Sequence, residues 1–479
     1  MSQQLGPGAT VPRKRALFGL LDADGWWWAG VKAAVWLVII ILMLGYIPDR
    51  AYYLTVNKTV ELGVLVWSPI NFCDPGNETL PCPAPVGAVV PWHGSPPDLA
   101  LPAPRTDGGV VQVGSSLLYV GGSDGTTAQS TVYVAPTVGV GNFGKWAEGP
   151  ALPEPRTDAA TIAVSGIVYV IGGRDADGAP TTTVYRLVPD PQTGVLDDWE
   201  VAEELVLPEG RAGAAVVSTP DGILVIGGEG PGGPVATTYK SRFGTDGSLG
   251  AWEAEASLVT PQADGNAAAL GDVVVLWGGH DANGPVARVQ IGEVGLEAAE
   301  GLPDNPDEGK LVQWRTNDTI SMPAPRDDAA GWSANGTIYA VGGTDGGAPQ
   351  PELYWAIPNA DGTVIEWKHL EQSDLPTGIS GGAAVVTGPN AVIVGGETAE
   401  GVVATSVRAN TAPQAPFFQL GLVGATVPGL KIEGEIGQQL GYLNAAGAGT
   451  VDFIILILIG WAFAHKEQAR GLIRRVLRR

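Results

Sequence analysis

The sequence predicts an all-β protein of repeated four-stranded sheets, with one transmembrane helix at each end. Three observations support this. Glycine provides 69 and proline 38 of the 479 residues, yet 45% of the residues are hydrophobic, so the chain is rich in turns and can still form a core. A β-branched run followed by a glycine pair recurs six times, and two long apolar segments flank the repeats. A collagen is excluded because no three-residue glycine period is present.

Residues 1–27 are predicted to form a cytoplasmic N-terminus, followed by a transmembrane helix at residues 28–47. This segment contains one charged residue, Lys32, and about twenty residues are needed to cross a bilayer as a helix. The basic residues 13–15 precede it, which favours a cytoplasmic start. A cleaved signal peptide is the weaker alternative, because the Tyr-Ile-Pro-Asp sequence at 46–49 offers no small-residue cleavage site.

Residues 48–83 are predicted to form an extracytoplasmic stalk with a disulfide loop. Cys73 and Cys82 flank a Pro-Gly turn and are the two cysteines of the chain, so in an oxidising compartment they would pair. A metal site is not expected, because the chain has four histidines that are not clustered in the sequence.

The C-terminal region is predicted to contain a juxtamembrane linker at 412–443, a second transmembrane helix at 444–465 and a basic cytoplasmic tail at 466–479. The formal charge is +2 over residues 1–48, −30 over 49–464 and +5 over 465–479, which sums to the net charge of −23. Positive flanks remain in the cytoplasm. We therefore expect an integral protein of the plasma membrane with both termini cytoplasmic and the repeats extracytoplasmic. Nucleic acid is not an expected partner, because an acidic surface repels phosphates.

Residues 84–411 contain six repeats, each with a hydrophobic strand that ends in a glycine pair. The pairs are Gly121-Gly122, Gly172-Gly173, Gly227-Gly228, Gly278-Gly279, Gly342-Gly343 and Gly395-Gly396. Four repeats continue with a tyrosine and then a tryptophan, namely Tyr133 and Trp146, Tyr185 and Trp199, Tyr239 and Trp252, and Tyr354 and Trp367. We interpret each repeat as four strands, with glycine where a side chain would block close strand approach. Such sheets bury both faces when they are stacked around an axis.

This pattern resembles the kelch repeat over about residues 84–411, and the resemblance implies a six-bladed kelch-type β-propeller. Together with the flanking helices it suggests a bacterial, membrane-anchored member of the family. The fourth and sixth repeats depart from the pattern, with Val289 and Val407 at the tyrosine position, and no tryptophan follows in the sixth repeat. The segment Val86–Trp92 is predicted to supply the missing fourth strand and to close the ring.

The resemblance also implies a channel mouth, because the first strand lines the central channel of kelch propellers. In the loop before this strand, the arginine position and the aspartate position two residues later are candidates for ligand binding. A metal or catalytic role is not expected for them. The candidate residues are Arg105, Asp107, Arg156, Asp158, Arg211, Asp264, Arg326 and Asp328. Such a mouth suits a polar ligand, for example a sugar acid or a peptide tip. The alternative is that each arginine pairs with a neighbouring carboxylate and holds adjacent blades together.

Three functions are compatible with these features. The favoured one is a non-catalytic binding or scaffold module for protein or glycan partners at the cell surface. A sialic-acid-like epimerase or mutarotase is the second, with carboxylates as its acids and bases, because the expected mouth positions lack histidine and His280 follows its glycine pair in a loop. The third is an accessory subunit of a larger membrane complex. No cofactor is expected: the copper radical oxidases of this fold need a cysteine at the site, and both cysteines here are predicted to pair outside the propeller.

Overall fold

The computed structural model describes residues 87–89, 92–94, 99–138, 142–190, 193–295, 307–317, 321–334, 336–388, 390–411, 417–419 and 426–431. The predicted membrane spans at 28–47 and 444–465 and the two cysteines lie outside these residues. Within these described residues, no helix has the length and hydropathy that crossing a bilayer requires.

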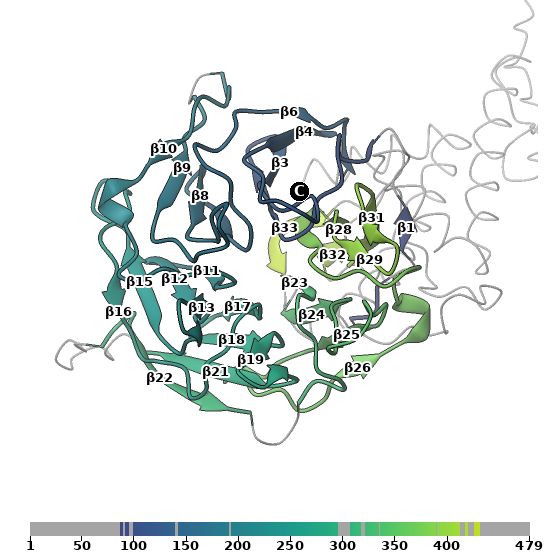
Figure 1. Cartoon of the computed structure of the whole chain (residues 1–479). Coiled ribbons are helices and arrows are strands. Elements are labelled where there is room, and N and C mark those ends of the chain that lie inside the picture. The colour runs from purple at the N-terminus through teal and green to yellow at the C-terminus, as the bar shows by residue number, and fades with distance from the viewer. Residues whose placement is uncertain are drawn as a thin grey trace, which may run out of the picture.

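Six antiparallel sheets surround a central axis (Figure 1). The first contains β2 (Gly109–Val113), β3 (Ser116–Val120), β4 (Val132–Val138), β5 (Asn142–Phe143) and β6 (Ala147–Glu148). The second contains β7 (Ala160–Val164), β8 (Ile167–Ile171), β9 (Val184–Leu187) and β10 (Glu200–Val201). The third contains β11 (Ala215–Thr219), β12 (Gly222–Ile226), β15 (Thr238–Arg242) and β16 (Glu253–Ala254).

The other three sheets repeat this order. The fourth contains β17 (Asn266–Leu270), β18 (Val273–Trp277), β21 (Val289–Val294) and β22 (Leu311–Thr316). The fifth contains β23 (Ala330–Ala334), β24 (Thr337–Val341), β25 (Leu353–Ala356) and β26 (Lys368–His369). The sixth contains β27 (Ala383–Thr387), β28 (Asn390–Val394), β31 (Ser406–Asn410) and β1 (His93–Gly94). The prediction of an all-β, six-bladed propeller is confirmed.

The first strand of each sheet is the innermost. Each of β2, β7, β11, β17, β23 and β27 contacts the corresponding strand in both neighbouring sheets, so these six strands form a closed inner wall.

The second strand of each sheet supplies the core on both of its faces. In β3, Leu117 and Tyr119 pack towards the sixth sheet, whereas Leu118 and Val120 pack towards the second. Alternate residues of a strand point to opposite faces, so a continuous apolar run is what a strand buried on both sides requires. Six such hydrophobic clusters are present among the described residues, each between adjacent sheets.

Each glycine pair joins one blade to the next. The amide of the second glycine donates to a backbone carbonyl in the next blade, two residues before the aspartate position. Examples are Gly173 to Arg211 at 2.7 Å and Gly396 to Arg105 at 2.7 Å. A Cβ on Gly172 would lie 2.3 Å from the Arg211 carbonyl oxygen, and the φ angle of Gly172 is +63°. Glycine is therefore required both for the backbone conformation and for the close contact.

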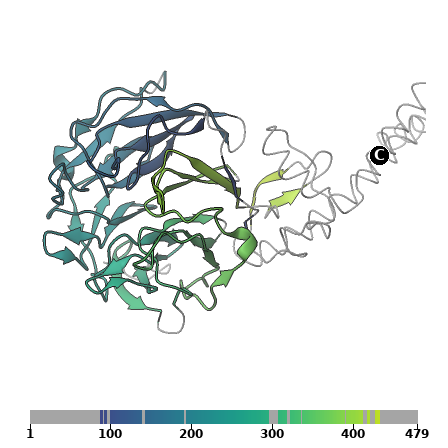
Figure 2. The same ribbon diagram turned by 45° about the vertical axis from the view of Figure 1, so that its right-hand side comes forward.

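The ring is closed by the N-terminal side of the propeller. β1 pairs with β31 through His93 and Arg408 and through Gly94 and Val407, so the closing strand lies directly after the predicted segment Val86–Trp92. Trp92 donates from Nε1 to the carbonyl oxygen of Ser373 in the fifth blade at 2.9 Å. In Figure 2 the yellow-green sixth sheet lies between the dark-blue first sheet and the green fifth sheet.

Short elements complete the described fold. After three of the glycine pairs the chain forms two-stranded hairpins: β13 (Glu229–Gly230) with β14 (Gly233–Pro234), β19 (His280–Asp281) with β20 (Gly284–Pro285), and β29 (Glu397–Thr398) with β30 (Gly401–Val402). The 3₁₀ turns η3 and η4 cover Glu203–Leu205 and Glu371–Ser373. Within the predicted linker, β32 (Phe417–Gln419) pairs with β33 (Thr426–Lys431).

Candidate functional site

The four predicted arginines lie inside the blades. Their exposed fractions are 1–5%, and each guanidinium lies over the ring of a third-strand tyrosine, with its carbon 5.1–5.4 Å from the ring centre. Arg156 illustrates the pattern, since it donates to the Pro155 carbonyl at 2.7 Å, to Tyr185 at 3.0 Å and to Glu154 at 2.9 Å. The arginines thus hold the loop before the first strand against the third strand.

The aspartates that follow the arginines do surround one end of the channel. Here a cavity of about 220 Å³ is lined by the four aspartates and by Gly213 and Gly381 at the equivalent positions of the other two blades. None of the described lining residues is an arginine. Of the two positions expected to surround the mouth, the aspartate position does so and the arginine position does not. The lining aspartates are Asp107, Asp158, Asp264 and Asp328.

A shared backbone conformation places these aspartates. Their φ angles are +50° to +54°, and those of Gly213 and Gly381 are +57° and +61°. Aspartate is one of the few side chains that tolerates this left-handed region. The residues are also linked from blade to blade, because Asp158 donates its amide to the Asp107 carbonyl at 3.0 Å and Asp264 donates to the Gly213 carbonyl at 2.8 Å.

The two glycines make room for neighbouring carboxylates. A Cβ on Gly213 would lie 2.1 Å from Oδ1 of Asp264, and a Cβ on Gly381 would lie 2.2 Å from Oδ1 of Asp107. Glycine at these two positions is therefore part of how the acidic ring is packed, and the side chains of Asp264 and Asp107 are directed along the ring towards the glycines.

Burial and mutual repulsion raise the pKa values of the ring. Burial, followed by the charge of Asp158, raises the pKa of Asp107 to about 7. Burial, followed by the charge of Asp327, raises the pKa of Asp328 to about 8. Burial and the charge of Asp328 also raise the pKa of Asp264 well above its usual range. A buried carboxylate that lacks a counterion favours a proton or another cation, so this mouth has a chemical preference for positive charge.

A second ring of polar residues lies at the same mouth. The residue directly after each glycine pair forms a backbone bridge with the residue before the aspartate position, so it lies beside the cavity lining. These residues are Ser123, Arg174, Glu229, His280, Thr344 and Glu397. This second ring was not predicted from the sequence. The signal was available, because all six positions are polar or charged although they follow strongly apolar strands.

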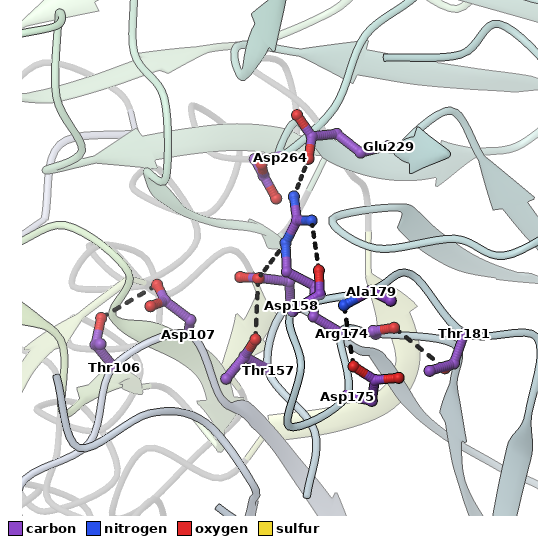
Figure 3. A network of polar contacts seen from close by, with 12 residues as sticks. Thr106, Asp107, Thr157, Asp158, Arg174, Asp175, Ala179, Thr181, Glu229 and Asp264 are labelled. Carbon is purple, nitrogen blue, oxygen red and sulfur yellow. Dashed lines mark hydrogen bonds and ion pairs between the residues drawn. The ribbon is translucent and has the colours of Figure 1, made fainter. Parts of the chain in front are cut away.

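Polar contacts link three residues of the second ring, which come from the second, third and fourth blades. Arg174 contacts Asp158 with 3.2 Å between Nε and Oδ2 and also pairs with Glu229 (Figure 3). Glu229 in turn contacts Nε2 of His280 at 3.0 Å, and Nδ1 of His280 faces Asp327 at 2.9 Å. His280 therefore lies beside the mouth, although the predicted mouth positions themselves contain no histidine.

One segment of the chain matches the model of a known protein family. A family model described as the Kelch motif matches residues 155–194, which extend from the Arg156 loop through β9 of the second blade. The match shows that this part of the second blade is similar to the Kelch motif.

Individual relatives are distant or match over part of their length. The "Kelch-like protein terF" of Aspergillus terreus is 25% identical over 328 residues, which is 65% of each chain. Beta-scruin of Limulus polyphemus is 25% identical over 259 residues, or 52% of this chain and 25% of that protein. The "Kelch repeat protein M-T8" of Myxoma virus is 37% identical over 83 residues, or 17% and 15%. The matches thus span 15–65% of these relatives' lengths.

Among solved structures, one titled "Structure of YjhT" matches with a TM-score of 0.49 and 16% identity, covering 64% of this chain and 95% of that one.

Proposed function

We propose that this protein is a membrane-anchored, extracytoplasmic binding module that accepts a positively charged group of a protein partner at its channel mouth. The partner's group would be a lysine or arginine side chain at the tip of a loop or peptide. A kelch propeller is consistent with a binding or scaffold role, and the acidic ring supplies the chemical preference.

The observation that carries the proposal is the unbalanced charge of the mouth. Four aspartates line the cavity, whereas the guanidinium of Arg174 at its edge is already paired with Asp158 and Glu229. Burial, followed by the charge of neighbouring carboxylates, raises the pKa values of Asp107 and Asp328, and an inserted ammonium or guanidinium group would stabilise their ionised forms.

The same charge disfavours the sugar-acid alternative. A ligand carboxylate would enter a ring in which like charges already raise aspartate pKa values, and the arginines that might have neutralised it are buried within the blades. The third alternative, an accessory subunit of a membrane complex, concerns the spans at 28–47 and 444–465 and remains open beside the mouth's binding role.

Anchoring by two helices stays part of the proposal on sequence grounds. The positive charge of both flanks and the −30 charge of residues 49–464 support cytoplasmic termini and an exported propeller. An oxidising location would also suit the proposed pairing of Cys73 with Cys82.

Binding can be tested with the full-length chain reconstituted in lipid nanodiscs. Peptides ending in lysine or arginine, acidic peptides and neutral and anionic glycans would be compared on one array. We expect the basic peptides to bind, with affinity that falls as salt rises. The double variant Asp107→Asn/Asp328→Asn should weaken binding by at least about tenfold, since each opposed charge pair in a partly buried site contributes on the order of 1 kcal/mol or more.

Glu148→Gln is the matched control, because Glu148 is an exposed carboxylate on the outer strand β6 and its substitution changes the net charge without touching the mouth. Equal affinity for basic and acidic peptides, or unchanged affinity in the double variant, would contradict the proposal. Selective capture of a neutral glycan would instead support a glycan ligand.

A further inference from the structure

A histidine and two aspartates from neighbouring blades converge at one side of the mouth. His280 lies on β19 after the fourth glycine pair, Asp264 lies in the loop before β17, and Asp327 lies in the loop before β23. Nδ1 of His280 is 2.9 Å from Oδ1 of Asp327 and 3.4 Å from Oδ2 of Asp264. These three donor atoms lie within 4.8 Å of one another.

We propose that Nδ1 of His280, Oδ2 of Asp264 and Oδ1 of Asp327 form a binding site for a divalent transition-metal ion of the zinc type. Asp264 belongs both to the acidic ring and to this site, whereas Asp107, Asp158 and Asp328 of the ring are not ligands of it. Metal–ligand bonds of about 2.1 Å place neighbouring ligand atoms about 3.0–3.4 Å apart, and the two distances from His280 match that spacing.

The other nitrogen of His280 supplies an independent argument. Nε2 lies 3.0 Å from Oε1 of Glu229, and a carboxylate at that distance accepts a hydrogen bond, so Nε2 carries a proton. In the neutral ring Nδ1 then presents a lone pair to two carboxylate oxygens. That arrangement requires a cation between them, either a proton on Nδ1 or a metal ion. A carboxylate on the far nitrogen is also the usual support for a metal-bound histidine.

The backbone fixes all three ligands before any ion binds. His280 and Ala263, the neighbour of Asp264, exchange two backbone hydrogen bonds of 2.8 and 2.9 Å. Asp327 and Thr344 exchange two of 2.8 Å, and the Asp264 amide donates to Gly213 at 2.8 Å. A site with ligands already in place pays little ordering entropy on binding. The three side chains are half-buried, which leaves water to complete the coordination.

The choice of metal follows from the donors. One imidazole nitrogen and two carboxylates suit zinc, manganese or iron, whereas calcium and magnesium prefer oxygen ligands alone. Further carboxyl groups, Asp158 and Asp328, line the cavity beside the site, and the nearby guanidinium of Arg174 is already paired with Asp158 and Glu229.

The test uses the untagged full-length chain, stripped with a chelator. Calorimetric titration with Zn²⁺ should show one strong site per chain that excess Ca²⁺ does not occupy, and Co²⁺ should give a visible absorption band. We expect His280→Ala and Asp327→Asn to weaken Zn²⁺ binding by at least a hundredfold, and Glu229→Gln to weaken it by about 10–100-fold through the histidine orientation.

Asp345→Asn is the control, because Asp345 is an exposed carboxylate one residue beyond Thr344 on the same loop, and it should leave Zn²⁺ affinity unchanged. Thermal unfolding of each metal-free variant verifies that it folds. The proposal is overturned if Zn²⁺ binds wild type and His280→Ala equally. It is also overturned if Zn²⁺ does not bind the stripped wild-type chain. Protons on both ring nitrogens of His280, found by nitrogen NMR, would then identify the cation as a proton.

Discussion

At the scale of single residues, the position that enters each first strand determines both the backbone turn and the charge of the mouth. The residue that enters each first strand adopts a left-handed conformation, which limits it to glycine, aspartate or asparagine at low cost. Four of the six blades use aspartate there. The result is a ring of partly buried carboxylates, so a residue compatible with the turn also creates the electrostatics of the mouth.

The raised pKa of Asp107 makes a stability prediction. Burial raises this pKa from its usual 3.8 to about 7, so the folded state binds more protons than the unfolded state between about pH 4 and 7. Its contribution is therefore fully favourable below pH 4 and is lost as the pH rises through 7. Asp107→Asn keeps the left-handed backbone and removes the titration. At pH 8 we expect the variant to unfold at a higher urea concentration than wild type, with a free energy of unfolding that is larger by about 2 kcal/mol.

Urea unfolding of both proteins at pH 4 and pH 8 measures this difference, which should shrink towards pH 4. Glu148→Gln, at an exposed site, should follow the wild-type profile. Parallel profiles for wild type and Asp107→Asn would show that Asp107 has an ordinary pKa.

The arginines show the limit of inference from residue type. Their repeated position was predicted correctly, but their side chains lie over tyrosines inside the blades. The repeat pattern places each arginine in the loop before the first strand, whereas the direction of its side chain depends on the aromatic ring and carbonyl groups that surround it after folding. Arg156, Arg211 and Arg326 each have a glutamate partner, as the structural alternative expects. These partners belong to the same blade as the arginine, so the ion pairs do not hold adjacent blades together.

At the scale of elements, the glycine pair is the joint between blades. Gly172 would bring a Cβ to 2.3 Å from a backbone oxygen of the next blade, whereas a Cβ on Gly178, in the hairpin loop that follows, would contact nothing within 4 Å. Both residues have positive φ angles, +63° and +78°. The two positions thus separate the cost of conformation from the cost of the clash.

We predict that Gly178→Ala destabilises the fold by about 1–2 kcal/mol, which is the cost of a left-handed non-glycine residue. Gly172→Ala should cost at least about 2 kcal/mol more, because the backbone of the neighbouring blade must move. Chemical denaturation of the three proteins gives the comparison. Equal costs would mean that the blades are not joined through this contact.

The short hairpins after the glycine pairs could not be predicted from the sequence. The apolar second strands and the glycine pairs were identified from their repetition, whereas the short hairpins after the pairs were read as loops. These hairpins have two-residue strands, too short for an alternating pattern. Their folding towards the axis depends on backbone bridges such as Ala263 with His280, which no local pattern encodes.

At the scale of the whole molecule, closure joins distant ends of the repeat region. β1 and β31 are paired although more than three hundred residues separate them, and Trp92 fills the gap between the fifth and sixth blades. Both chain segments that leave the ring therefore start at the same blade, which is compatible with two neighbouring membrane helices.

The proposed topology predicts which sites face the cell exterior. A cysteine introduced by Asp177→Cys, at an exposed position of the second blade, should react with a membrane-impermeant maleimide on intact cells. Ser2→Cys should react only after the cells are permeabilised. The wild-type protein should react only after reduction if Cys73 and Cys82 are paired. Labelling of Asp177→Cys that requires permeabilisation would contradict an extracytoplasmic propeller.

The sequence by itself determined the all-β class, the six blades, the glycine joints and the closing N-terminal segment, because each depends on a pattern that recurs at a fixed spacing. It also located the aspartate ring, whose position repeats with the blades. Only the tertiary structure decided that the arginine side chains are buried inside the blades and that His280 lies beside Asp264 and Asp327. The arginine contacts join a loop to the third strand of the same blade, and the contact of His280 with Asp327 joins two blades. Both depend on the packing of strands and sheets rather than on local spacing.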